Sequence, residues 1–252
     1  RSVLVRYFDW LASALQGDLG KSFRTNQPVM NMLLPALGRT ILLAGSAFLV
    51  TIVVSVPLGV ICALNKDKPI DRIVRWVTYI FYALPMFVVG ILALYVFAMQ
   101  LHWFPISATS KQSNLGLVLP VIVLALSMSA WLIRQTRTIF LEKMNEPYVL
   151  GLRALGISSK KIDFIYILKH SMVPIITDLG IILGSMMGGA VLIETVFSWP
   201  GVGQILMTAI SNLDYPVIQG FALWIAIVYF IINLLIDVLC RVADPRIARP
   251  RR

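Results

Sequence analysis

The chain has 252 residues, of which 58% are hydrophobic and 13% are charged, and its mean hydropathy is +0.83. Soluble domains carry about 45–50% apolar and about 25% charged residues, so this composition excludes an ordinary soluble domain and indicates a polytopic membrane protein. The net charge of +10 does not indicate nucleic-acid binding, because excess Lys and Arg in membrane proteins gather in cytoplasmic loops.

Residues 1–39 are predicted to form an external amphipathic segment. Apolar side chains recur from Val3 to Leu15 at helical spacing, which predicts a short helix. The run GDLGKSF that follows is not a phosphate-binding loop, because Leu15 stands where that motif needs its first glycine. We interpret this run as a turn.

Five uncharged or nearly uncharged segments are long enough to cross a hydrocarbon core about 30 Å thick. The predicted spans are residues 40–64, 76–101, 115–133, 172–193 and 217–240, and Pro85 is expected to kink the second. The chain is therefore predicted to be an all-α bundle of membrane helices.

Lys and Arg gather in residues 66–75, 134–170 and 241–252, whereas 102–114 contains only Lys111 and 194–216 contains none. This asymmetry predicts that the loop 134–170 and the basic tail 241–252 are cytoplasmic and that 194–216 is external. A basic external start has no span to carry it across the membrane, so one further span upstream of this chain is expected, which gives six.

No catalytic or metal-binding constellation can be assembled, since His102 and His170 have no Cys or carboxylate at ligand spacing. Asp178, inside the fourth span, is either a carboxylate of the transport pathway or a polar contact paired with Lys169 or a partner helix. Glu194 and Asp237 lie at span ends, where we expect them to be hydrated.

Two further features are structural predictions. Gly180, Gly184 and Gly188 recur every four residues and form a predicted packing face in the fourth span. The external loop 194–216 is unusually apolar, which predicts a re-entrant or interfacial helix that forms part of a gate.

The cytoplasmic loop 134–170 has the pattern helix, glycine corner, helix. Asn145 is the predicted N-cap, Glu146 and Pro147 occupy the first turn, and the helix is expected to stop at Gly156. Ser158 or Ser159 then caps a second helix that runs to about Lys169. The loop is either an interfacial linker or a coupling element that inserts into a cytoplasmic partner.

At this point the sequence resembles a known family. The run from Tyr148 through Gly156 to Pro174 resembles the glutamate-alanine-alanine loop of ABC importer permeases. The runs LLPALGRTILLAG, GDLGKSF, ETVFSWPGVG, DYPVIQG and ADPRI are similar to the first membrane subunit of the dipeptide, oligopeptide and nickel transport family. The chain departs from that pattern at Pro147 and Leu152, where Asp and Ala are usual.

The resemblance implies a type I ABC importer permease and assigns roles to individual residues. The ATPase-coupling residues would be Glu146, Pro147, Tyr148, Arg153, Ala154, Gly156, Ser158, Lys160 and Lys161. The external loop or gate would include Phe197, Trp199, Pro200, Gly201, Gly203, Asp214, Tyr215 and Pro216.

The resemblance also implies partners and a location. The chain would lie in the bacterial inner membrane as a non-enzymatic subunit, with a homologous second permease, two cytoplasmic ABC ATPases that hold ATP and Mg²⁺, and an external substrate-binding protein. The implied cargo is a di- or oligopeptide, with nickel or a nickel chelate as the alternative. A stand-alone carrier or channel is the competing class.

Overall fold

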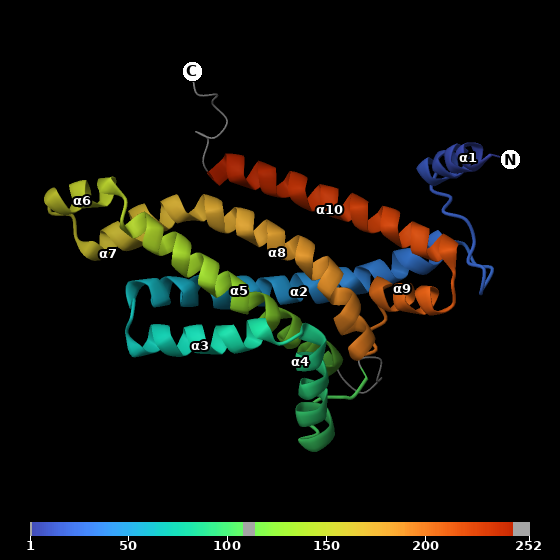
Figure 1. Ribbon diagram of the computed structural model, residues 1–252, viewed down its shortest axis with the longest axis horizontal. Coiled ribbons are helices and arrows are strands. Elements are labelled where there is room, and N and C mark those ends of the chain that lie inside the picture. Colours follow the sequence, from blue (N-terminus) through green and yellow to red (C-terminus); the bar gives the residue numbers. More distant parts are fainter. Residues whose placement is uncertain (1, 108–113, 244–252) are drawn as a thin grey trace. The chain divides into compact units, whose positions relative to one another are not determined.

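The computed structural model describes residues 2–107 and 114–243, and these residues are mainly helical (Figure 1). The predicted basic tail beyond Ala243 and the external Lys111 lie outside the described residues. Within the described residues, four helices are long and apolar enough to cross a membrane. They are α2 (Val29–Leu64), α5 (Val118–Met144), α8 (Leu168–Val196) and α10 (Tyr215–Ala243).

A fifth candidate span is broken. Helix α3 (Pro69–Ala83) ends at Leu84, whose backbone is extended with ψ 130°, and α4 (Met86–Ala93) begins after Pro85. A residue before proline is pushed out of the helical region, so the proline that was predicted to kink this span interrupts the helix instead. Helix α4 continues as the π-helical η1 (Leu94–Gln100).

The chain folds as two compact units, and the long helices contribute residues to both. Unit 1 consists of Arg1–Ser46, Met86–Val123 and Met187–Phe230. Unit 2 consists of Ala47–Pro85, Leu124–Met186 and Ile231–Arg252.

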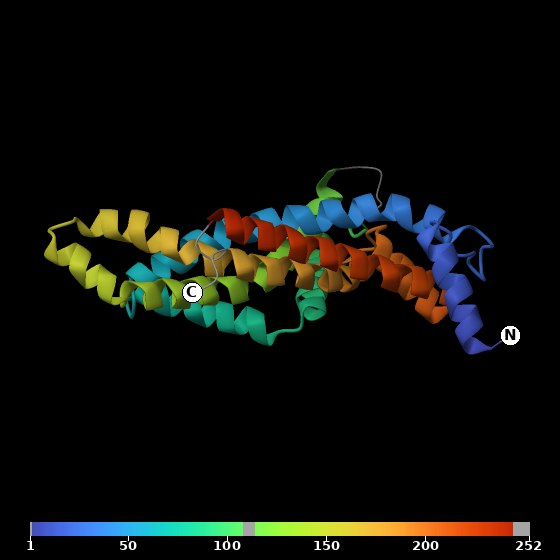
Figure 2. The ribbon, with the colours of Figure 1, turned by 90° about the horizontal axis from the view of Figure 1, so that it is seen from above.

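Unit 1 contains α1 (Val3–Leu15), η2 (Asn114–Leu117) and α9 (Val202–Ser211) together with parts of the long helices. Helix α9 lies beside the first part of α2 and the start of α10 (Figures 1 and 2). Their contact is a core of Leu19, Val29, Leu33, Ala36, Val202, Ala209, Val217 and Phe221. The predicted amphipathic helix and the helix in the apolar loop 194–216 are therefore both present.

Unit 2 contains α3, α6 (Pro147–Ala154), α7 (Ser159–Lys161) and the π-helical η3 (Ile162–Ile167). The end of α2 and the start of α3 form a hairpin, and α5 packs against α2 (Figure 1). A Cβ on Gly59 of α2 would lie 2.6 Å from the Thr136 Cβ and 2.9 Å from the Ile133 carbonyl oxygen of α5. The close approach of these two helices therefore requires glycine at position 59.

Helical backbone extends further than the sequence predicted in three places. Helix α2 begins at Val29 rather than near residue 40, and α5 continues to Met144 rather than ending near residue 133. Helical backbone is also continuous from Ser159 to Val196 through α7, η3 and α8. Pro174 therefore lies inside α8. A proline removes one backbone donor, and the side-chain packing of a long apolar helix offsets this loss.

The Gly59 contact makes a stability prediction. Gly59→Ala forces a methyl group against α5, and overpacking of this kind costs about 1–3 kcal/mol. Gly45→Ala is the matched control, since a Cβ on this other glycine of α2 meets nothing within 4 Å. Thermal unfolding in detergent should show a lower midpoint for Gly59→Ala and an unchanged or higher midpoint for Gly45→Ala. Equal midpoints for the two variants would contradict the observed packing.

Candidate functional site

Glu194, near the end of α8, is completely buried, with 0% of its surface exposed. The sequence predicted hydration for this residue because of its place at a span end, and that prediction is wrong. Helix α9 and the first part of α2 fold over the end of α8 and remove the carboxylate from solvent. A buried carboxylate of this kind is stable only where hydrogen-bond donors surround it.

The donors come from two segments far apart in the sequence. The Thr40 hydroxyl of α2 donates to Glu194 Oε1 at 2.5 Å. The backbone N–H groups of Gly203 and Gln204, in the first turn of α9, donate to Oε2 at 2.7 and 3.3 Å. Thr40 Oγ1 in turn accepts from the Val202 N–H at 3.0 Å. The carboxylate thus binds the positive end of α9 and ties it to α2.

This carboxylate explains the glycines of the run ETVFSWPGVG. A Cβ on Gly201 would collide with the Glu194 carboxyl group, and a Cβ on Gly203 would collide with the Val191 backbone. Trp199 and Phe197 also contribute to the burial of this region. The Trp199 indole N–H donates to the Arg39 carbonyl at 3.0 Å, and Phe197 is buried. Of the predicted gate residues, Trp199, Gly201 and Gly203 therefore lie against Glu194.

Asp214, the second acidic residue of the predicted gate, anchors a different segment. Its carboxylate accepts from the Ser22 hydroxyl at 2.5 Å and from the Phe23 N–H at 3.0 Å. Burial alone would raise the pKa of Asp214, but these bonds, with others from backbone N–H groups, hold it below its ordinary value. The runs GDLGKSF and DYPVIQG therefore meet in the fold. Tyr215 beside Asp214 is exposed, and a Cβ on Gly20 would lie 4.0 Å from the Pro216 Cβ.

The predicted coupling element is a helical hairpin in unit 2. Helix α6 has Glu146 as its N-cap and Pro147 as its first residue, so the predicted N-cap Asn145 is one position too early. The reason is local, because a residue before proline adopts extended backbone and Glu146 therefore cannot be helical. The Asn145 amide instead donates to the Leu141 carbonyl at 2.8 Å.

The predicted glycine corner is confirmed, and its geometry is a Schellman cap. Gly156 has φ +75°, its N–H bonds to the Arg153 carbonyl at 2.9 Å, and the Ile157 N–H bonds to the Leu152 carbonyl at 3.2 Å. Ser158 then caps the next helix, as one of the two predicted alternatives.

The hairpin has a buried side and an exposed side. Val149, Ile162 and Ile167 are fully buried in a core with Val60, Ala63 and Phe140. The opposite side exposes Leu150 and Leu155, which are 67% and 78% exposed. Arg153, Ala154, Lys160 and Lys161 are exposed with them. Sequence reasoning missed the two leucines, although their helical offset from Val149 is the signal that identifies them.

Glu146 and Tyr148, two further residues of the predicted coupling set, make contacts within unit 2. The Lys143 ammonium pairs with Glu146 at 2.5 Å. The Tyr148 ring lies 5.1 Å from the His170 ring, between the centroids, and links α6 to α8. Burial, followed by the nearby Glu146 charge, raises the pKa of Tyr148. Glu146 and Tyr148 thus contact neighbouring residues of unit 2, whereas Leu150, Arg153 and Leu155 are part of the exposed surface of the hairpin.

The predicted packing face of α8 is only partly occupied within this chain. A Cβ on Gly180 would collide with Ile236 of α10, so this glycine permits close helix contact. A Cβ on Gly188 would meet nothing within 4 Å, and Gly184 is half-buried. Asp178 does not pair with Lys169, and its Oδ2 is buried with no hydrogen-bond partner among the residues that the structure describes.

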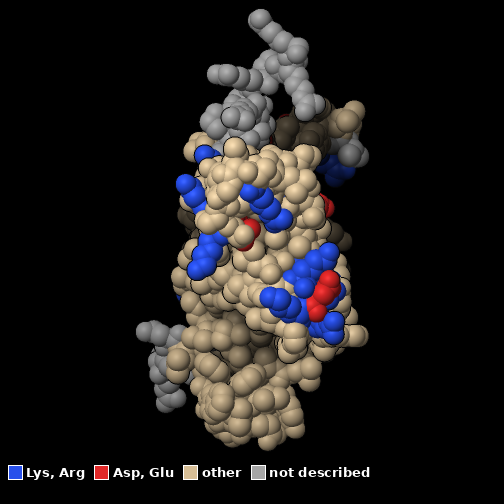
Figure 3. All heavy atoms as spheres, turned by 90° about the vertical axis from the view of Figure 1, so that its left-hand side faces the viewer, with Lys and Arg blue, Asp and Glu red and all other residues tan. Residues whose placement is uncertain are grey.

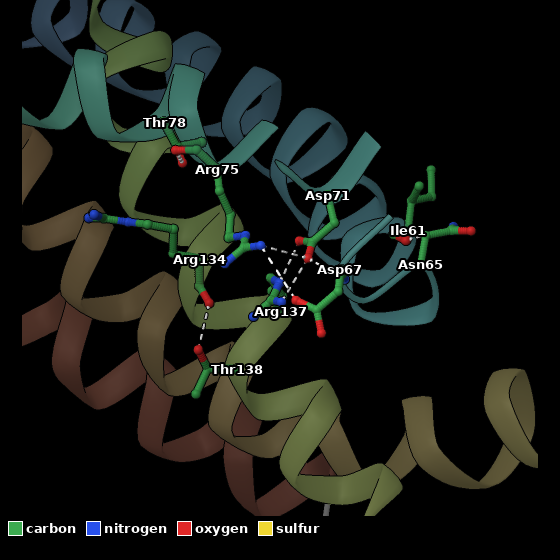
Figure 4. Close-up of polar contacts among 9 residues, drawn as sticks. All are labelled: Ile61, Asn65, Asp67, Asp71, Arg75, Thr78, Arg134, Arg137 and Thr138. Carbon is green, nitrogen blue, oxygen red and sulfur yellow. Dashed lines mark hydrogen bonds and ion pairs between the residues drawn. The ribbon is translucent and has the colours of Figure 1, made fainter. Parts of the chain in front are cut away.

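Sequence reasoning also missed a charge cluster between α3 and α5 (Figure 4). Asp71 is fully buried and receives two hydrogen bonds from the Arg137 guanidinium, at 2.7 and 2.8 Å. Arg75 lies 3.4 Å from the same carboxylate and 3.6 Å from Asp67. Nearby, the Asn65 amide caps the end of α2 by donating to the Ile61 carbonyl at 2.9 Å. The cluster joins α3 to α5. Its charged residues were predicted to lie in two separate basic loops, 66–75 and 134–170.

The family model described as "Binding-protein-dependent transport system inner membrane component" matches residues 55–249, and the chain belongs to this family. This confirms the resemblance to ABC importer permeases.

Two relatives and one solved structure agree with this assignment. The chain is 36% identical to a probable peptide ABC transporter permease of Sinorhizobium fredii over 249 residues, which are 96% of this chain and 80% of the relative. It is 36% identical to the nickel import system permease NikB of Staphylococcus aureus, over 97% of this chain and 73% of the relative. The inward-facing MetNI methionine ABC transporter shares the fold, with a TM-score of 0.72 and 16% identity, over 85% of this chain and 97% of that chain.

The Glu194 network predicts coupled stability effects. Glu194→Leu removes the acceptor of the Thr40 hydroxyl and leaves the N–H groups of Gly203 and Gln204 unpaired, and each unsatisfied buried group costs about 1–3 kcal/mol. Thr40→Val removes one of the same bonds. In a double-mutant cycle measured by thermal unfolding, each single variant should lower the midpoint, and the double variant should lower it by less than the sum. Additive losses would show that the two residues do not act together.

Proposed function

We propose that this chain is one of two membrane subunits of an ATP-driven importer and that the α6–Gly156–α7 hairpin couples it to an ATPase. The observation that supports this most is the exposed surface of the hairpin. Leu155 and Leu150 project from a corner whose backbone is fixed by the Schellman cap and by the core around Val149. Exposed apolar side chains beside Arg153 and Lys160 suit insertion into a groove with an acidic rim.

The hairpin is built to transmit force as a rigid body. Its second helix continues without a break from Ser159 to Val196, so a displacement of the corner moves α8 along its length. The Tyr148–His170 contact and the buried core around Val149 would restrict movement of the corner independently of α8. Closure of two ATPases, which hold ATP and Mg²⁺, would then move α8 and open or close the spans.

The direction of insertion follows from charge. Lys and Arg gather on the end of unit 2 seen in Figure 3, over the region of the α2–α3 turn and the α6–α7 corner. By the positive-inside rule this end would be cytoplasmic, and the basic residues of 241–252 in the sequence predict the same side for the C-terminus. The loop 194–216, which contains α9 and Glu194, has no Lys or Arg, so the same rule predicts that it is external and would face the substrate-binding protein. A homologous second permease completes the membrane part of the importer as a heterodimer.

The proposed cargo is a di- or oligopeptide, and a nickel ion or nickel chelate is the second candidate. Each candidate is supported by a relative that is 36% identical to this chain. One relative is described as a probable peptide permease and the other as a nickel import permease. Titration of the cognate substrate-binding protein with dipeptides, with oligopeptides and with a nickel chelate decides between them, because that protein selects the cargo.

Gly156→Val tests the coupling role. The corner needs φ +75°, which a β-branched residue adopts only at a cost of about 1–3 kcal/mol, so the orientation of Leu155 should change. In proteoliposomes that contain the whole importer, we expect the loss of most transport and of substrate-stimulated ATP hydrolysis. The amount of permease in the membrane should stay the same.

Gly17→Val is the matched control. Gly17 has φ +86°, and a Cβ on either glycine meets nothing within 4 Å, so both variants carry similar backbone strain. Gly17 lies in the predicted external segment, and its variant should transport normally. Normal transport by Gly156→Val, or equal losses in the two variants, would refute the coupling role.

A further inference from the structure

A hollow of about 400 Å³ lies beside the Asp71 cluster in unit 2. Helices α3 and α5 form its walls, and neither the coupling role nor the Glu194 network uses it. Its lining is cationic, aromatic and amide- or hydroxyl-bearing. The lining residues are Arg75, Tyr79, Tyr82, Trp131, Arg134, Gln135, Arg137 and Thr138.

The three arginines of the hollow carry more charge than the adjacent acids neutralise. Arg137 is satisfied by its two bonds to Asp71. Arg75 makes only the longer contacts of 3.4 and 3.6 Å, and its Nε is buried with no partner among the described residues. Arg134 forms no ion pair within the described part of the chain. The hollow therefore holds unpaired guanidinium donors.

Arg134 is held in place by aromatic rings. Its guanidinium carbon lies 4.1 Å from the centroid of the Tyr82 ring and 5.5 Å from that of the Tyr79 ring. In Figure 4 its side chain extends away from Asp71, while Arg75 and Arg137 point toward that carboxylate. A guanidinium stacked on rings keeps its planar N–H groups free for a two-oxygen acceptor. Stacking thus orients Arg134 before any ligand arrives.

The hollow lies where the charged parts of α3 and α5 meet their apolar parts. Arg75 is the last charged residue of α3, and Arg134 is the first charged residue of α5. Trp76, Tyr79 and Tyr82 are exposed on α3 at this level. Aromatic rings beside basic residues between membrane helices are typical of the membrane–water interface and of sites for anionic groups.

We propose that this hollow binds one oxyanion group, a phosphate or a carboxylate, through the guanidinium groups of Arg134 and Arg75, with Gln135 and Thr138 as further polar contacts. Two sources carry this chemistry: the phosphodiester of an anionic phospholipid, and a soluble anion such as inorganic phosphate or the terminal carboxylate of a peptide. The site depends on unit 2 alone, so its existence can be tested independently of coupling and transport.

The test uses the full chain purified in a neutral detergent, with thermal unfolding followed by tryptophan fluorescence. The probes are phosphatidylglycerol against phosphatidylcholine, inorganic phosphate, and the dipeptide Ala-Ala against its C-terminal amide. We expect a saturable rise of the midpoint with phosphatidylglycerol, with phosphate or with free Ala-Ala. A rise with phosphatidylglycerol alone assigns the site to lipid, and a rise with phosphate or free Ala-Ala assigns it to a soluble anion.

Three variants make the test specific. Arg134→Gln should weaken binding of the active probe by about tenfold or more, as expected for the loss of a charge-assisted hydrogen bond. Arg134→Lys keeps the charge without the planar fork and should give an intermediate loss, which also covers the case in which Arg134→Gln fails to fold. Arg72→Gln removes the same charge from an exposed position of α3 outside the hollow and should bind like the parent chain. No midpoint rise with any probe, or equal losses in Arg72→Gln and Arg134→Gln, would overturn the proposal.

Discussion

Unit 1 depends on the hydrogen bonds that a single buried carboxylate accepts. Glu194 has no contact with solvent, and removal of charge from water is costly unless donors replace the lost hydration. The Thr40 hydroxyl and the first N–H groups of α9 are those donors. The same bonds satisfy the start of α9, which would otherwise have unpaired backbone groups. One side chain therefore fixes the positions of α2, α8 and α9 and dictates glycine at two positions of the loop.

Unit 2 also contains a buried carboxylate, and there an ion pair with arginine stabilises it. Asp71 is equally buried, and the Arg137 guanidinium binds both of its oxygens in the fork geometry that gives the strongest hydrogen bonds. This pair joins α3 to α5, and the core around Val149 joins α5 to the α6–Gly156–α7 hairpin. In the proposed coupling role, these contacts would carry a displacement of the hairpin into α5 and α8. The excess of arginine at the pair also leaves the cationic hollow that we assign to an oxyanion.

Features that depend on neighbouring residues could be predicted from the sequence. The amphipathic helix Val3–Leu15 and the corner at Gly156 follow from periodicity and capping, and both are present. The N-cap at Asn145 failed because the restriction before Pro147 is stronger than the preference of Asn. Glu194 and the Asp71–Arg137 pair could not be predicted, since their burial depends on segments 154 and 66 residues away. Periodicity carries no information about such contacts.

The central claim is that the corner at Leu155 contacts an ATPase, and cross-linking tests it most directly. Leu155→Cys places a thiol on a side chain that is 78% exposed, and Leu15→Cys does the same at a site that is 82% exposed on α1. The native Cys62 is buried, and the parent chain gives the background from Cys240. In membranes that contain the whole importer, a bismaleimide should join the Leu155→Cys chain, but not the Leu15→Cys chain, to an ATPase subunit. Full maleimide labelling of Leu155→Cys without any cross-link to an ATPase would contradict the account.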